Sequence, residues 1–113
     1  MNKTINRSVL VIIPKKPFYD WGNSTTPDET PIDKFDECNS YLLDEGWAYA
    51  DAEHFVKANF DIFFQELLEG MWTDEAAWPQ KRTWEMFNEW FDWHFSSMVW
   101  DIFNDKPFVY EEW

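Results

Sequence analysis

The residues best able to do chemistry are one cysteine, two histidines and the carboxylates. Cys38 beside a histidine would form a nucleophile–base pair, but no catalytic pattern flanks it, and a cysteine in a strand is more often a small core residue. His54 and His94 share no metal-ligand spacing. Glu89 and Asp92 would have to complete the three or four ligands that zinc requires around His94. We therefore predict no catalytic residue, no metal site and no cofactor.

The carboxylates also form pairs, which is the arrangement that supplies the acid and base of glycoside hydrolases. The pairs are Asp44 with Glu45, Glu66 with Glu69, Asp74 with Glu75, Glu85 with Glu89, and Glu111 with Glu112. A chain with 22 acidic residues forms such pairs by number alone. One small domain also leaves little room for a deep cleft, so the pairs do not predict an enzyme.

Aromatic residues are also abundant: the 113 residues include nine tryptophans, eleven phenylalanines and four tyrosines. Such rings either fill a core or anchor a partner or ring-stacking ligand. Five tryptophans are not assigned to the core by the pattern of apolar residues: Trp21, Trp47, Trp72, Trp78 and Trp93. Most of these lie in expected loops or at the ends of expected elements, where binding sites tend to occur. We expect them to contribute to a binding site.

Charge limits the classes of partner. The formal net charge is −13, and residues 1–16 carry four of the nine bases and no acid. Residues 17–113 are strongly acidic. This argues against binding to nucleic acid, whose phosphates are bound by Lys and Arg, and against binding to anionic membranes. It permits a basic protein partner. The basic N-terminal segment also permits a homo-oligomer, in which it meets the acidic face of a second copy.

Glu85, Glu89 and Asp92 form an acidic stripe at helical spacing. Such a stripe is usually a solvated helix face, and the alternative is a docking face for a basic partner.

Length and composition indicate one domain, residues 1–113, with 45% hydrophobic residues and an ordinary core. A single cysteine precludes an intrachain disulfide and favours a reducing compartment. The apolar run at 9–13 is cut short by Pro14, and no run approaches the roughly 20 residues that span a bilayer. We expect a soluble cytoplasmic protein.

Periodicity predicts the elements that position these residues. Strands are expected at 8–13 and 38–45. Asp51 is an expected N-cap for a helix reaching about residue 69, with Gly70 as its C-cap. A further helix is expected from Pro79 to about residue 93, followed by a strand at 95–102. A helix continuing through residue 103 is the alternative to that strand.

The remaining segments are expected to be irregular. Residues 1–7 are expected to be frayed, residues 15–21 to form a connector, and residues 22–34 to form a polar loop. One helical turn capped by Thr73 is expected within residues 72–78, and the tail after Pro107 is a candidate edge strand.

These elements predict an α+β domain of order β-β-α-α-β, a two-layer sandwich with two helices on one face of a small, mainly antiparallel sheet. A mostly helical domain with one hairpin is the alternative. The expected core consists of Val9, Val11, Ile13, Leu42, Phe60, Phe63, Leu67, Trp84, Phe87, Phe91, Met98 and Trp100.

Two segments carry a resemblance. VIIPKKPFYDW at 11–21 and WTDEAAWPQKRTWEMFNEWF at 72–91 resemble segments of small, acidic, uncharacterised bacterial proteins. The resemblance implies a bacterial cytoplasmic protein and transfers no site residue.

Together these features predict a non-enzymatic interaction or regulatory protein that uses an acidic, aromatic-rich surface. The alternative is a small-ligand-binding module or a small enzyme with a tryptophan-lined pocket.

Overall fold

The computed structural model describes residues 3–32, 38–44 and 51–111. In chain order its elements are β1 (Lys3–Thr4), β2 (Arg7–Pro14), α1 (Lys16–Thr25), β3 (Asn39–Asp44), α2 (Ala52–Met71), the 3-10 turn η1 (Glu75–Ala77), α3 (Trp84–Trp90), β4 (Phe91–Ser96) and β5 (Trp100–Asp101). The predicted α+β class is confirmed, with three α-helices and two small antiparallel sheets among the described residues.

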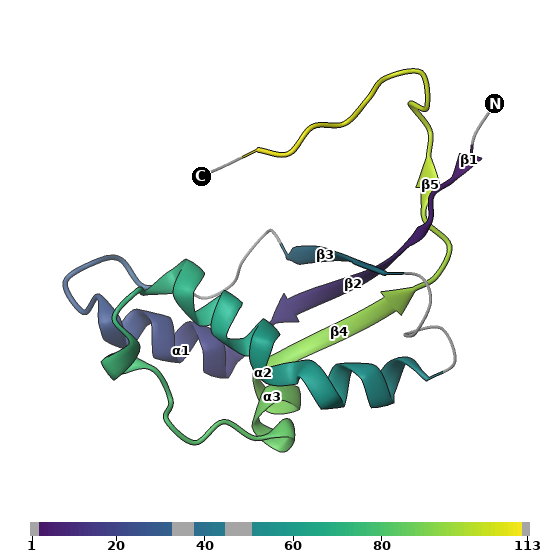
Figure 1. The fold of residues 1–113 in the computed structure, drawn as a ribbon. Helices are drawn as coiled ribbons and strands as arrows, with labels where there is room; N and C mark the ends of the chain where they lie inside the picture. Colours follow the sequence, from purple (N-terminus) through teal and green to yellow (C-terminus); the bar gives the residue numbers. More distant parts are fainter. Residues whose placement is uncertain (1–2, 33–37, 45–50, 112–113) are drawn as a thin grey trace.

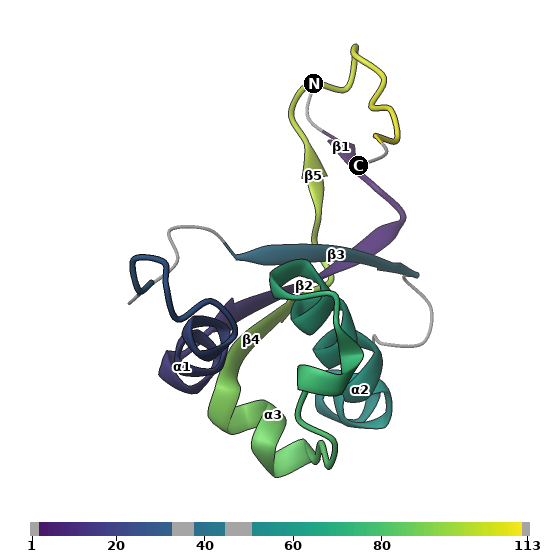
Figure 2. The same ribbon diagram turned by 90° about the vertical axis from the view of Figure 1, so that its left-hand side faces the viewer.

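Strand β2 is the centre of the main sheet. It pairs antiparallel with β3 on one edge and β4 on the other, so that Leu10 lies opposite both Tyr41 and Phe95. The helices lie on one face of this sheet, which gives the expected two layers (Figure 2). Beyond the sheet, β1 and β5 form a narrow ribbon that leads away from the helices (Figure 1).

Helix α1 is a correction to the predicted order. Residues 16–25 were expected to be a connector and the start of the polar loop at 22–34, but they form a helix. Pro17 stands in the first turn, where its fixed φ favours a helix and its missing N–H costs nothing. Phe18 and Tyr19 are buried, so packing against the sheet stabilises this short helix. Irregular structure begins only at residue 26.

Helix α2 begins as predicted, because the Asp51 side chain accepts a hydrogen bond of 3.0 Å from the backbone N–H of His54. The predicted C-cap at Gly70 is wrong. Gly70 continues the helix, and the N–H of Trp72 still donates to the carbonyl of Leu68 at 2.9 Å. No described glycine adopts a positive φ. The helix therefore extends to Met71 without a left-handed cap.

The helix expected at 79–93 and the strand expected at 95–102 both form, but with different boundaries. Helix α3 is short, opens at the Thr83 cap and ends at Trp90, where the strand β4 begins. The sequence from Phe91 alternates aromatic and polar residues, F-D-W-H-F-S, which fits a strand with one buried face. Pairing of this segment with β2 decides the boundary, since Phe91 lies opposite Pro14.

Three smaller segments also differ from expectation. Residues 3 and 4, expected to be frayed, form β1, and described residues 107–111 form no strand. The turn within 72–78 is capped by Asp74, whose side chain accepts a hydrogen bond from the N–H of Ala76, and not by Thr73.

The core is built largely from rings. Phe64 is fully buried, and its ring centroid lies 5.9, 5.5 and 5.3 Å from those of Phe87, Trp90 and Phe91. These contacts bring α2, α3 and β4 together beneath β2. Aromatic pairs at such separations stabilise a fold beyond the area that they bury.

The expected core is partly correct. Phe63, Leu67, Phe87 and Phe91 are buried, and Phe60 and Trp84 pack against the buried cluster. The other six are misplaced: Val9, Val11 and Ile13 are only partly buried, and Leu42, Met98 and Trp100 are exposed. β2 buries Ser8, Leu10 and Ile12 instead. An unbroken apolar run does not reveal which of its two faces meets the helices.

The ring core predicts a large cost for truncating its central member. We expect Phe64→Ala to lower the free energy of unfolding by about 3–5 kcal/mol, because it removes a fully buried ring and leaves a cavity. Ile62→Ala on the same helix is the control. Ile62 is 62% exposed, so the change should stay within about 0.5 kcal/mol. Urea unfolding followed by circular dichroism measures both, and equal losses would contradict this core.

Candidate functional site

Two of the tryptophans predicted to bind a partner, Trp21 and Trp78, instead form hydrogen bonds within the chain. The indole N–H of Trp21 donates to the carbonyl of Ala77 at 2.9 Å, and its ring lies against Phe18 and Trp90. Trp78 is only 7% exposed, and its indole N–H donates to the carbonyl of Trp72 at 2.7 Å. Both side chains fix the connection between α2 and α3.

The other predicted tryptophans are distributed differently. Trp72 begins this same connection and is 37% exposed. Trp93 lies on β4, partly buried, with its indole N–H donating to the Asn88 side chain at 3.1 Å and its ring near Trp84. Trp47 lies outside the described residues. Thus Trp21, Trp72 and Trp78 meet at one connection, and Trp93 belongs to another part of the molecule.

The predicted acidic stripe is divided by the end of α3. Glu85 and Glu89 are exposed on the helix, but Asp92 belongs to β4. Its carboxylate lies 3.7 Å from the Nζ of Lys15, the residue that precedes α1. The stripe is therefore not a single helical face, and Asp92 already has a basic neighbour.

A groove forms where α2 and the following connection face each other. It has a volume of about 670 Å³. Its lining residues, hereafter the acidic groove, are Ile62, Gln65, Glu66, Glu69, Thr73, Asp74, Glu75, Ala76 and Trp78. Four are carboxylates and none is basic. Among these residues only Trp78 comes from the predicted set of binding residues. The sequence shows Glu66 with Glu69 and Asp74 with Glu75 as separate pairs, but contains no signal that they share one groove.

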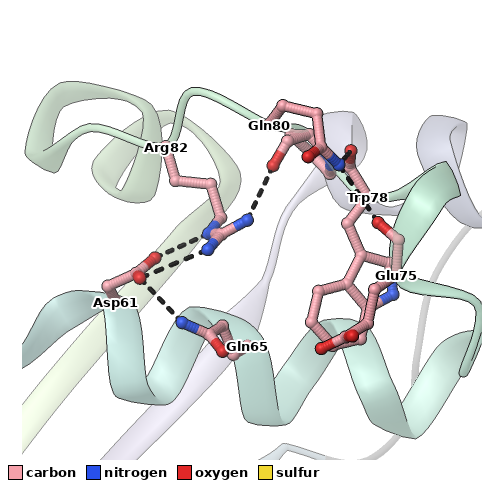
Figure 3. A network of polar contacts seen from close by, with 7 residues as sticks. Asp61, Gln65, Glu75, Trp78, Gln80 and Arg82 are labelled. Carbon is pink, nitrogen blue, oxygen red and sulfur yellow. Dashed lines mark hydrogen bonds and ion pairs between the residues drawn. The ribbon is translucent and has the colours of Figure 1, made fainter.

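The connection that forms one wall of the groove is held by a network of polar contacts (Figure 3). The guanidinium of Arg82 donates to both carboxylate oxygens of Asp61 on α2, at 2.6 and 3.3 Å, and to the carbonyl of Pro79 at 2.8 Å. The side-chain amide of Gln80 donates to the carbonyls of Glu75 and Trp78. The Arg82–Asp61 pair ties the end of the connection to α2, and the other bonds hold residues 75–82 together.

Two titratable side chains near the groove respond to these surroundings. The hydrogen bond from Arg82 lowers the pKa of Asp61, which outweighs the effect of its partial burial, and a bond from Gln65 assists. Burial raises the pKa of Tyr41, and the negative charge of Glu66 raises it further, against a hydrogen bond from Asn39.

The remaining chemically capable residues lie apart from one another. Cys38 is exposed and unpaired, and His54 and His94 are exposed on α2 and β4. Within the described residues, no group of three or more His, Cys, Asp or Glu side chains is arranged to hold a metal ion. The acidic groove offers concentrated negative charge beside one exposed apolar side chain, Ile62, and the largely buried Trp78. That combination suits a cationic ligand with an apolar part.

Comparison with models of protein families, with curated proteins and with solved structures finds no match to this chain. In the part of the chain that the structure describes, no helix has both the length and the apolar character needed to cross a membrane.

The Asp61–Arg82 pair predicts a dependence of stability on pH. Because the pKa of Asp61 is lowered on folding, the folded state binds fewer protons than the unfolded state as the pH falls below about 4. The contribution is therefore complete above that pH and is lost as the pH falls through the folded pKa. We expect Asp61→Asn to cost about 1 kcal/mol near pH 7, and almost nothing in strong acid.

Urea unfolding of the wild-type and variant chains over a pH series measures this difference. Asp105→Asn is the matched control, because Asp105 is exposed and forms no ion pair with any described residue. A cost for Asp61→Asn that does not change with pH would contradict the assigned role of the ion pair.

Proposed function

We propose that this chain is a non-enzymatic interaction protein, and that its acidic groove binds a basic segment of a protein partner. The observation that carries the proposal is the groove itself: four carboxylates line one concave surface of a chain with a net charge of −13, with no basic side chain in the lining. Opposite charge steers partners together and selects among them.

The side chains of the groove support a segment that carries both charge and apolar stems. Lys and Arg bury the methylene part of their side chains along apolar surface while the charged end stays near acids. Ile62, 62% exposed, provides that apolar surface, whereas Trp78, 7% exposed, adds little to it. Glu66 and Glu69 on α2 and Asp74 and Glu75 opposite provide the charge.

The fixed wall supports binding as well. The bonds from Trp78, Gln80 and Arg82 hold the connection in place before any partner arrives. A surface that is already ordered loses less conformational entropy on association, which raises the affinity that a given set of contacts provides.

We further propose that the protein acts in the cytoplasm. The support is the unpaired and exposed thiol of Cys38, which is the usual state of cysteine in a reducing compartment.

Peptide binding tests the groove directly. The probe is a short synthetic peptide of alternating Lys and Leu, titrated by fluorescence anisotropy at low and high salt. We expect Glu66→Gln with Glu69→Gln to weaken binding by roughly 2- to 30-fold, the equivalent of two exposed ion pairs. Salt should weaken wild-type binding as well, because it screens exposed charges.

Glu85→Gln with Glu89→Gln is the matched control, because it removes the same charge from exposed positions on α3 that do not line the groove. This control should bind nearly as tightly as the wild type. If the two double variants weaken binding equally, the peptide recognises net charge alone and the groove is not its site. A peptide of alternating Glu and Leu should not bind.

A further inference from the structure

The ribbon of β1 and β5 and the segment that follows it form an arm, residues 3–6 and 98–111, that stands away from the body (Figures 1 and 2). Lys3 lies opposite Asp101, Thr4 lies opposite Trp100, and the N–H of Ile5 donates to the carbonyl of Val99 at 2.9 Å. Within the described residues, β1 and β5 pair with no other strand. The arm thus continues the pairing of β2 and β4 beyond the helical layer.

The arm exposes far more apolar surface than a lone domain requires. Seven large apolar side chains are 57–90% exposed: Met98, Trp100, Ile102, Phe103, Phe108, Val109 and Tyr110. At roughly 200 Å² for each side chain they present on the order of 1,000 Å² to water. One partner in a stable protein–protein interface contributes about 800 Å². Apolar exposure concentrated in so few residues is typical of a surface that binds a partner.

The arm also contains a hollow of about 430 Å³. Its lining is mostly apolar, and the residues are Ile5, Trp100, Asp101, Phe103, Lys106, Pro107 and Phe108. The Nζ of Lys106 lies 5.5 Å from the centre of the Phe103 ring. No described carboxylate forms an ion pair with Lys106. The hollow thus combines aromatic walls with two oppositely charged side chains, Lys106 and Asp101.

Tyr110 and the residue after it are complementary to this hollow, because they present an exposed ring and a negative charge. It is 90% exposed and touches Phe108 edge-to-face at 6.3 Å, but it does not line the hollow of its own chain. Glu111, also exposed, follows it. The same chain therefore carries an apolar hollow beside a lysine and an exposed ring beside a glutamate.

We infer that two copies of this chain associate through their arms: Tyr110 of each copy enters the hollow of the other, and Glu111 lies beside Lys106 of the other copy. The exchange is reciprocal, so it closes as a two-fold dimer and does not propagate. Each copy contributes the apolar area that a stable interface needs. The inference concerns a different surface from the acidic groove, and either one can fail without the other.

The net charge of the chain favours a dimer in which the two bodies stay apart. Each chain carries a net charge of −13, so two bodies in direct contact would repel. The arm places the contact away from the carboxylates of the acidic groove. Its own described charges nearly balance, with Lys3 and Lys106 against Asp101, Asp105 and Glu111. A dimer joined by its arms also leaves both acidic grooves open to a partner.

Sedimentation velocity over a range of protein concentrations tests the dimer. We expect the wild type to form a dimer and Tyr110→Ser to shift the equilibrium strongly towards the monomer. Tyr110 is so exposed that this change should leave the fold intact, which circular dichroism checks. Leu42→Ser, at an exposed apolar site on β3, is the control and should dimerise like the wild type.

A charge exchange provides the sharper test. Lys106→Glu alone and Glu111→Lys alone each place like charges at both contacts, and each should weaken dimerisation by roughly 10- to 30-fold. The double variant restores opposite charges and should recover the wild-type equilibrium. A wild-type chain that stays monomeric at every concentration overturns the inference. A dimer that is indifferent to Tyr110→Ser, or single variants that the double variant does not rescue, would overturn it as well.

Discussion

The pairing of β2 along both of its edges positions the rest of the domain. β3 and β4 are fixed to it in register, and the register turns Leu10 and Ile12 towards the helices. The N–H of Lys15, just after β2, donates to the carbonyl of Trp90 at 2.8 Å and so ties the end of α3 to the start of α1. Rings from α2, α3 and β4 then fill the space beneath the strand.

This packing accounts for most of the aromatic content and separates two unlike surfaces. The rings around Phe64 form the core, and Trp21 and Trp78 use their indole N–H groups to fix the wall of the acidic groove. The groove is charged and hollowed, whereas the arm is apolar and exposed. One surface suits a basic segment and the other suits a second copy. Charge and apolar area are thus separated along one small chain.

The sequence predicts those parts of the fold that depend on local signals. The Asp51 cap, α2 and the apolar run of β2 were all correctly expected. Helix α1 was missed because its Lys-Lys-Pro start resembles a connector, and only tertiary burial of its aromatic face reveals it. The acidic groove could not be predicted either. It exists because the chain after α2 turns back, and long-range bonds such as the one from Arg82 to Asp61 hold that turn in place.

The central claim is that the acidic groove, and not acidity in general, is the binding surface. An NMR titration with the Lys–Leu peptide tests it most directly, because each backbone amide reports separately on its surroundings. The account predicts the largest shift changes at residues 62–69 of α2 and 73–78 of the connection, with little change at residues 85–89 of α3. Changes spread evenly over the acidic residues of the whole surface, or concentrated on α3, would contradict it.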